Sequence, residues 1–495
     1  MKNFKIKALI ALLAINFVSC DNYLDINEDP NNPQIEQVHP ALMLPGAMTG
    51  AYRVQSRTMN QLGNIWMQNW GGDVNNFTGA NTDEYQMQLS NSFYSGIWDG
   101  LYPSMANFTQ ITKFDSPDYD NHKAVAYIMR AFYMQYIVDL YGDAPFKEAF
   151  QLAANTTPAY DDDKEIYRTL VTDIDNAVQM FYDADSNDKA LGTSDVIFAG
   201  NINKWIRFAN TLKLRLLLRQ SNLTDAETVA YLNDQFATLD GAIFLEENAL
   251  INPGYSNKTT AQLNPFYALF KTTAGENTQF YNFTRATAYV GAFLNGTATE
   301  TAGLTDPRGA RLYNLQGGQV VGAVQGATTG PDPMSEIGTG LIRTASSDGV
   351  VFSLAETNFL LAEAALKGYL PSIAGMEQMY FDNGVTASFE LLGLTAADAA
   401  NYLANASGYP NVGWNGDFMQ AIMTQKWIAC NGFNGIESFI EMNRTGFPVL
   451  PMPTTSLFPN RPYRLLYPTS ELVANSANVP GIQLSQIFTQ GPFWK

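Results

Sequence analysis

The sequence predicts a mainly α-helical fold, in which helical hairpins pack against a loop-rich, irregular region with a few short strands. Apolar residues recur at helical spacing through the first half of the chain and again near its C-terminus. Between these parts lies a long stretch rich in glycine, asparagine and threonine. No charge run or low-complexity linker divides the chain, so we expect one body over residues 41–495 rather than separate domains.

The first half, about 41–240, has the pattern of stacked helical hairpins. Helix-sized segments lie at residues 42–62, 92–113, 121–140, 160–182 and 201–221. In "IYRTLVTDIDNAVQMF" the apolar positions are three or four residues apart and form one face: Tyr167, Leu170, Ile174, Ala177, Val178 and Phe181. Segment 201–221 has a similar stripe with basic groups around it: Lys204, Arg207, Lys213, Arg215 and Arg219. We expect these cations to meet the chain's excess carboxylates rather than a phosphate ligand.

The middle of the chain, about 241–350, reads as long loops with short strands. "GAIFLEENALINPGYSNKTT" and "LYNLQGGQVVGAVQGATTGPDPMSEIG" contain few helical stripes and many turn-forming residues. Loops of this length inside a compact protein are usually functional or mobile. Helical patterns return at "SLAETNFLLAEAALKG", 353–368, and continue through "MQAIMTQKWIACNGFNGIESFIEMNRTG", which predicts a C-terminal helical part over about 351–495.

The N-terminus has the order of an export signal. Three lysines precede the apolar run "ALIALLAI", and small residues follow before Cys20. The apolar run is far shorter than the roughly 20 residues of a membrane-spanning helix. A small residue directly before cysteine resembles a bacterial lipobox, although Phe17 stands where leucine is usual. We therefore expect residues 1–19 to be a lipoprotein signal peptide and Cys20 to carry acyl chains such as palmitate; the alternative is a plain signal peptide with an incidental cysteine.

The residues after Cys20 suit a tether. "DNYLDINEDPNNP" combines acids, asparagines and prolines, which resist regular structure and keep the chain solvated. Buried acyl chains contribute about 0.8 kcal/mol per CH₂, so two or more chains would anchor the protein stably. The sequence thus predicts an acylated flexible leash over residues 20–40.

Charge and cysteine content exclude some classes of partner and bond. Removal of residues 1–19 takes three of the 29 basic residues and none of the 47 acidic ones, which leaves a net charge of −21. Such a chain repels nucleic acid. Only 15% of the residues are charged, so the surface must be covered mainly by uncharged polar groups. With Cys20 acylated, Cys430 has no partner for a structural disulfide.

A series of motifs in one order along nearly the whole chain resembles the SusD/RagB family of nutrient-binding outer-membrane lipoproteins, in its SusD-like type 2 branch. The motifs are the Cys20 leader with "LDINEDPNNP", "RAFYMQYIVDLYGDAPF", "PAYDDDKEIYRTLVTDIDNAV", "GNINKWIRFANTLKLRLLLR", "ETNFLLAEAALKG", "TQKWIACNGFNGIESFIEMNRTGFP" and "RPYRLLYPTSE". Their shared order makes the resemblance specific, whereas any one of them alone would be weak.

The resemblance implies a fold, a cellular location and a partner protein. The hairpins would be tetratricopeptide-like, and the protein would be lipid-anchored at the cell outer membrane and face outward. It would capture an oligosaccharide or a peptide and act as a hinged lid on a SusC-like, TonB-dependent barrel transporter. The resemblance implies no cofactor. A membrane-tethered hydrolase of the same nutrients remains the alternative function.

The residues that carry most of the resemblance have a structural interpretation. They are Arg130, Asp139, Tyr141, Gly142, Asp143 and Pro145. Gly142 can adopt a backbone conformation that ends a helix, and Pro145 prevents its renewal. Arg130 and Asp139 are nine positions apart, which puts them on opposite faces of one helix, so they cannot pair with each other.

The most site-like stretch is "WMQNWGGDVNNFTGANTDEY", residues 66–85. Aromatic rings alternate there with amides and a carboxylate around a glycine-bearing loop, the mixture expected of a ligand cleft. The candidate ligand-binding residues are Trp66, Trp70, Asp73, Asn75, Asn76, Phe77, Asn81 and Tyr85. The alternative for the two tryptophans, one helical turn apart, is ordinary core packing. Arg285 and Tyr289 in "RATAYVGAFLNG", and the glycine loop 314–340, are secondary candidates.

Catalytic and metal-binding patterns are weak. His39 and His122 are the only histidines, and no G-x-S-x-G motif is present. "DADSNDKALGTS", residues 183–194, begins like a calcium loop but has Asp188 where the turn glycine belongs and Ser194 where glutamate belongs. We expect a solvated turn between helices there, no catalytic residues and no metal site, although the resemblance leaves calcium elsewhere open.

Overall fold

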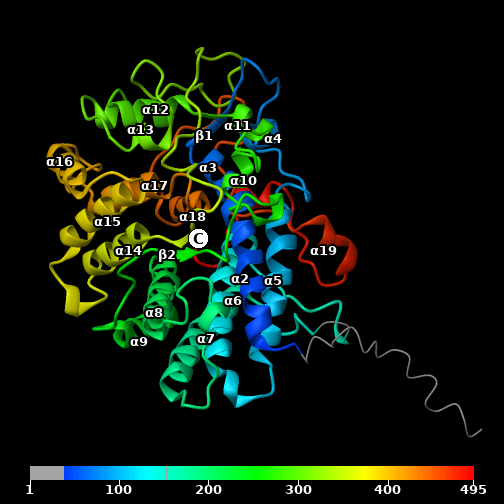
Figure 1. The fold of residues 1–495 in the computed structure, drawn as a ribbon. Coiled ribbons are helices and arrows are strands. Elements are labelled where there is room, and N and C mark those ends of the chain that lie inside the picture. Colours follow the sequence, from blue (N-terminus) through cyan, green and yellow to red (C-terminus); the bar gives the residue numbers. More distant parts are fainter. Residues whose placement is uncertain (1–37, 152–153) are drawn as a thin grey trace, which may run out of the picture.

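Helices and loops occupy different parts of the chain in the computed structural model, which describes residues 38–151 and 154–495 (Figure 1). The predicted signal peptide, Cys20 and nearly all of the predicted leash lie outside the described residues. Helical hairpins fill the lower and left parts of the figure, and loops with short helices fill its upper part. The mainly helical fold with a few short strands is confirmed.

The first half consists of helices that pack in sequence order. They are α2 (Pro40–Val54), α3 (Asn60–Trp66), α4 (Thr82–Gln86), α5 (Gly96–Thr112), α6 (Asp120–Tyr141), α7 (Asp163–Asp183), α8 (Ile202–Arg219) and α9 (Ala226–Leu239). A π-helical turn, Gln55–Met59, joins α2 to α3. Neighbouring helices from α5 to α9 lie side by side, and α2 packs on α5. The five predicted segments are thus helical, while α4 and α9 were not predicted.

Local signals set the ends of these helices. The Asp162 side chain accepts the backbone N–H of Glu165 at the start of α7, and Asn201 accepts that of Lys204 at the start of α8. Helix α6 ends at Tyr141 because Gly142 has φ +75°, a conformation that favours glycine. The predicted helix end at Gly142 is confirmed.

The loop-rich part contains two small antiparallel sheets. Strand β1 (Trp70–Gly72) pairs with β3 (Thr284–Ala286), and β2 (Ala249–Ile251) pairs with β4 (Gly349–Phe352). Short helices connect them: α10 (Tyr267–Phe270), α11 (Gln279–Phe283), α12 (Ala288–Asn295) and α13 (Gly309–Leu312). In the β1–β3 pair Gly71 faces Arg285, so residues far apart in the sequence become neighbours.

The C-terminal part contains α14 (Leu354–Leu366), α15 (Glu377–Leu391), α16 (Ala396–Ala406), α17 (Phe418–Cys430), α18 (Gly435–Thr445) and α19 (Thr469–Ala474). After Thr445 the described chain is largely irregular, and α19 is its one α-helix. The prediction of a helical part reaching residue 495 is wrong in this respect, because prolines recur through residues 448–492 and interrupt helix formation.

The basic groups of α8 are bound by carboxylates, as predicted. Arg219 is fully buried and contacts Asp139 at 3.2 Å, Glu437 at 2.8 Å and Glu441. Arg130 pairs instead with Asp173 at 2.6 Å, so Arg130 and Asp139 do not pair with each other. Salt bridges from α8 therefore join it to α6 and α18 inside one continuous apolar core.

No helix among residues 38–151 and 154–495 is both long and apolar enough to cross a membrane.

Candidate functional site

Two segments predicted separately as site candidates meet in the structure. Strand pairing brings Arg285 beside the start of the loop after β1, where its Nη2 donates to Oδ2 of Asp73 at 3.1 Å. Both side chains are nearly buried. Asp73 also accepts the backbone N–H groups of Asn75 and Asn76 and the side-chain amide of Asn76 at 2.9 Å. Asp73 is therefore the fixed point from which the loop starts.

Asn75 binds the glycine loop to the loop that starts at Asp73 through three hydrogen bonds. Its side-chain oxygen accepts the N–H of Gly330 at 3.0 Å, and its Nδ2 donates to the carbonyls of Gly330 and Pro331. The predicted candidates 73–85, Arg285 and 314–340 thus form one surface.

A cavity of about 200 Å³ opens in this surface, and we call it the loop cavity. Its walls come from residues 74–86, from the glycine-loop residues Gly326, Ala327 and Thr328, and from Thr455. Phe77 is half-buried and meets Phe283 edge-on at 5.4 Å between ring centroids, which leaves part of its ring toward the cavity. The wall therefore combines a fixed aromatic ring with threonine hydroxyls and backbone groups.

Tyr85 is the buried base of the cavity. Its hydroxyl accepts hydrogen bonds from the N–H of Gly72 and the amide of Asn81, both at 3.2 Å. Burial raises the pKa of Tyr85 to about 12, so the phenol stays neutral. Asn81 thus binds Tyr85, and the two residues stabilise the conformation of the loop.

Trp66 and Trp70 lie in the hydrophobic core, each with about 1% of its surface exposed. Trp66 packs on Phe439 at 4.7 Å, and Trp70 packs on Phe270 at 5.8 Å. The expectation that they are one turn apart on a helix is wrong, because α3 ends at Trp66 and a turn with Gln68 at φ +60° precedes β1. Their burial matches the core-packing alternative and removes both rings from the surface that a ligand could reach.

Tyr289 lies at a different cavity, of about 250 Å³, which we call the Tyr289 cavity. Although it is only four positions from Arg285, Tyr289 is on α12 and faces α17, the loop after α16 and the segment after α18. A third cavity of about 500 Å³ lies between α8, α14 and α15, lined in part by Asn358, Tyr380 and Asn383.

Thr455 and the residues opposite Tyr289 were not predicted as site residues. They come from segments 410–427 and 448–455. Thr424, Trp427 and Pro448 belong to the motif "TQKWIACNGFNGIESFIEMNRTGFP", which carries the family resemblance but does not single them out as site residues, and only the folded chain places these segments beside α12 and the loop after β1. Gly326, by contrast, belongs to the predicted glycine loop.

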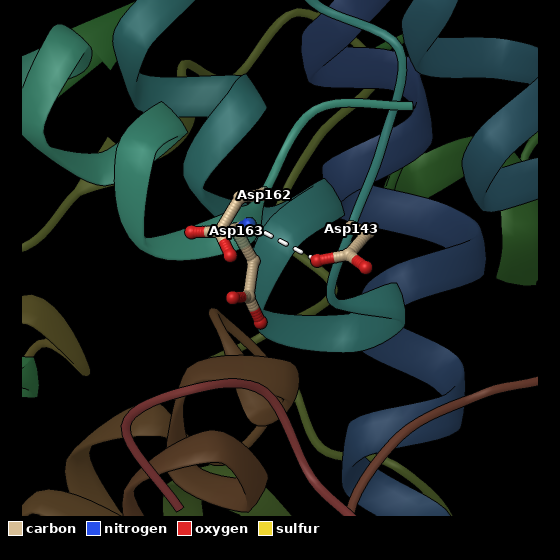
Figure 2. A group of neighbouring side chains, drawn as sticks. All are labelled: Asp143, Asp162 and Asp163. Atoms are coloured by element: carbon tan, nitrogen blue, oxygen red, sulfur yellow. Dashed lines mark hydrogen bonds between the residues drawn. The ribbon is translucent and has the colours of Figure 1, made fainter. Parts of the chain in front are cut away.

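Three carboxylates gather at the start of α7: Asp143, Asp162 and Asp163 (Figure 2). Each accepts a backbone N–H: Asp143 from Asp163 at 3.1 Å, Asp162 from Glu165 at 3.1 Å, and Asp163 from Phe493 at 2.8 Å. Burial raises the pKa of Asp163 to about 6. These bonds hold the start of α7 against the turn after α6 and against the C-terminal segment near Phe493. The three carboxylates therefore have a structural role. The calcium-like stretch forms the predicted turn, in which Asp185 and Asp188 accept backbone N–H groups.

The sequence matches the family SusD-like_2, described as starch-binding associating with outer membrane, over residues 30–468. No curated protein matches the chain. Among solved structures, the chain is similar to a Bacteroidetes AC2a SusD-like protein, with a TM-score of 0.71 and 22% identity over 92% of this chain and 99% of that one. It is also similar to a chitin-binding SusD homolog from Flavobacterium johnsoniae, with a TM-score of 0.70 and 22% identity over 88% and 94%.

A SusD homolog from Parabacteroides distasonis ATCC 8503 has a TM-score of 0.73 and 19% identity over 92% of this chain and 98% of its own. At these identities the likeness establishes the fold, and the predicted SusD-like architecture is confirmed.

Proposed function

Because this chain belongs to the SusD-like family of starch-binding proteins that associate with the outer membrane, we propose that it captures a neutral oligosaccharide at the loop cavity and passes it to a transporter. The observation that carries this proposal is the meeting of three loops around one cavity: residues 73–85, the glycine loop and the segment at Thr455. A chitin-binding relative and the family description both point to glycans as the ligand class.

The chemistry of the cavity suits a sugar. Sugar rings present C–H faces that stack on an aromatic ring, and their hydroxyls need donors and acceptors nearby. Phe77 offers the ring, and Thr78, Thr82, Thr328 and Thr455 offer hydroxyl groups. None of the described residues that line the cavity is charged, and the nearby Arg285 is paired with Asp73, so the cavity does not select for an anionic ligand.

The proposal includes an anchor and a partner. Cys20 would carry the acyl chains that hold the protein at the outer membrane, with the chain facing outward. The stable partner would be a SusC-like, TonB-dependent barrel over which this protein closes as a hinged lid. The low fraction of charged residues suits a broad polar interface of this kind, which stays partly wet when the lid opens. Extraction in mild detergent should recover the pair, and recovery of the lipoprotein alone would contradict this part.

The binding site is tested with Phe77→Ala. Loss of the ring should weaken binding of malto- or chito-oligosaccharides several-fold to tenfold, since aromatic stacking contributes about 0.5–1.5 kcal/mol beyond area burial. The melting temperature should change little, because Phe77 is only half-buried. Tyr182→Ala, which removes an exposed ring at the end of α7, is the matched control and should bind as the wild type does. Unchanged affinity in Phe77→Ala would refute the loop cavity as the site.

The alternative function, a tethered hydrolase, is tested on the same samples. A binding protein returns the oligosaccharides intact after long incubation. Shortened products that appear with the wild type and persist through further purification would favour the hydrolase.

A further inference from the structure

The Tyr289 cavity also combines an aromatic ring with hydrogen-bonding side chains. Tyr289 is half-buried, and its ring lies 5.9 Å from that of Trp427, tilted by 39°. Trp427 is itself buried and held by a bond from its Nε1 to the carbonyl of Met67 at 2.9 Å. The tyrosine ring is thus supported from behind by a fixed core residue.

The polar groups of this cavity keep unused hydrogen-bonding capacity. The Tyr289 hydroxyl donates to Oε1 of Glu300 at 2.6 Å, which leaves the second carboxylate oxygen as an acceptor. Oδ1 of Asn411 accepts the N–H of Asp417 at 2.8 Å, which leaves its NH₂ as a donor. The side-chain amide of Gln420 makes no hydrogen bond to any residue that the structure describes. The cavity therefore offers both donors and acceptors, which a ligand with several hydroxyl groups requires.

One segment of chain connects the two cavities. Pro448 and Val449 line the Tyr289 cavity, and Thr455 lines the loop cavity. Seven residues span at most about 25 Å when fully extended, so the two cavities lie within that distance of each other along this segment. The backbone N–H of Thr454 bonds to the carbonyl of Gln325 at 2.9 Å, and that of Leu457 bonds to Gln86 at 3.1 Å, which keeps the segment against the glycine loop and α4.

Exposed apolar side chains follow the same path. Val449 is 70% exposed and Leu457 is 65% exposed, and Val324, beside Gln325 on the glycine loop, is 51% exposed. Val449 lines the Tyr289 cavity, Leu457 lies two residues beyond Thr455, and Val324 adjoins Gln325, to which Thr454 bonds, so a ligand that lies along residues 448–455 can reach these side chains. The C–H faces of a sugar chain would cover them without requiring charge.

We propose that the Tyr289 cavity is a second subsite for the same oligosaccharide, so that a chain of several sugar units lies along residues 448–455 and contacts both cavities. This inference rests on the proposed function of the loop cavity. Each cavity is smaller than the roughly 300–1,000 Å³ typical of sites that enclose a whole ligand, which fits one or a few sugar rings in each and an extended chain between them.

The observations favour a saccharide over an extended peptide at this surface. Peptides commonly add to a free strand edge. Strand β3 is paired on both sides, with β1 on one and a bond from the N–H of Ala286 to the carbonyl of Ser335 at 2.9 Å on the other. The cavities instead offer side-chain amides, hydroxyls and rings.

The test compares oligosaccharide length with the site of mutation. Malto- and chito-oligosaccharides from the disaccharide to the hexasaccharide are titrated calorimetrically into the wild type, Phe77→Ala, Gln420→Ala and Tyr289→Phe. Wild-type affinity should rise with length. Gln420→Ala and Tyr289→Phe should each lower the affinity for the hexasaccharide about three- to tenfold, the range of a lost hydrogen bond, and leave that for the disaccharide unchanged. Phe77→Ala should lower the affinity at every length.

Asn383→Ala is the control, because it removes an exposed amide at the third cavity and should have no effect at any length. Unchanged hexasaccharide affinity in both Gln420→Ala and Tyr289→Phe would overturn the second subsite and leave the proposed function standing. If Gln420→Ala lost affinity at every length and Phe77→Ala lost none, the disaccharide would bind at the Tyr289 cavity. That result would refute both the loop cavity as the main site and the Tyr289 cavity as a second subsite. Binding of peptides but of no saccharide by the wild type would overturn both the inference and the saccharide specificity.

Discussion

Replacement of Arg285 by methionine should loosen the loop at residues 73–81, the proposed ligand-binding loop, without unfolding the protein. The change removes one of four hydrogen bonds to the Asp73 carboxylate, the charged bond of 3.1 Å, and leaves those from Asn75 and Asn76 in place. A hydrogen bond to a charged group contributes about 1.5–3 kcal/mol. The larger penalty of about 3–5 kcal/mol for breaking a buried ion pair does not apply in full, because Asp73 keeps three donors.

The expected cost is therefore about 1.5–3 kcal/mol, and it should be concentrated in the loop. Residues 73–81 contact the rest of the protein mainly through the hydrogen bonds of Asp73 and Asn75 and through the packing of Phe77 on Phe283. The loop can therefore open locally while the core stays folded. Amide hydrogen exchange should accelerate in this loop and remain unchanged in α6 and α8. Oligosaccharide affinity should fall about tenfold, because the ligand must then order the loop.

A double-mutant cycle with Asp73→Asn isolates the pair. If the two side chains act through each other, the double variant Arg285→Met with Asp73→Asn should cost clearly less than the sum of the single changes, with a coupling of at least about 1 kcal/mol. Additive effects, or exchange that accelerates throughout the protein rather than in the loop, would refute the assignment of this pair as the fixed point of the loop.

Further predictions concern the core, pH and the anchor. Arg219→Met leaves Asp139 buried without its cation and should cost about 3–5 kcal/mol in urea unfolding, whereas Lys204→Ala, at an exposed pair with Glu247, should cost at most about 1 kcal/mol. Burial lowers the pKa of His122 to about 4, so the unfolded chain binds a proton at a higher pH than the folded chain, and stability should fall as the pH drops from about 6.5 to about 4. His122→Gln should remove the part of this slope that lies between pH 7 and pH 5, roughly 2 kcal/mol, in unfolding curves measured at those two pH values. Cys20→Ala should be exported but partition into the aqueous phase in detergent separation, and wild-type partitioning would contradict lipidation.

The helical part of the fold was predictable because its signals are local. The apolar stripe on α7 and the basic residues around the stripe on α8 follow directly from residue spacing. The excess of carboxylates in the chain predicts that those basic residues form salt bridges with them. Gly142 marks the end of α6 by its conformational freedom. The irregular chain after Thr445 was missed, since a general helical pattern was extended past the point where prolines begin to recur.

The candidate site was predictable only in part, because its geometry depends on long-range pairing. Composition singled out residues 73–85 and Arg285, but the strand pairing that joins Asp73 to Arg285 links residues more than two hundred positions apart. Composition also cannot tell a ligand-facing ring from a core ring. Phe77 and Trp70 stand in the same stretch, yet Phe77 is only partly buried whereas Trp70 is fully buried and packs on Phe270.

The distribution of charge explains why this surface suits a neutral nutrient. Arg215 and Arg219 in the core are bound by carboxylates on α6, α14 and α18, and Arg285 is bound by Asp73. What remains at the two cavities is a set of rings, amides and hydroxyls with the single carboxylate of Glu300. Such groups bind weakly one by one, so useful affinity requires many of them along an extended ligand. The proposed chain of sugar units, reaching from Phe77 to Tyr289, would supply that length, and the proposed barrel closing from the other side would supply the remaining contacts.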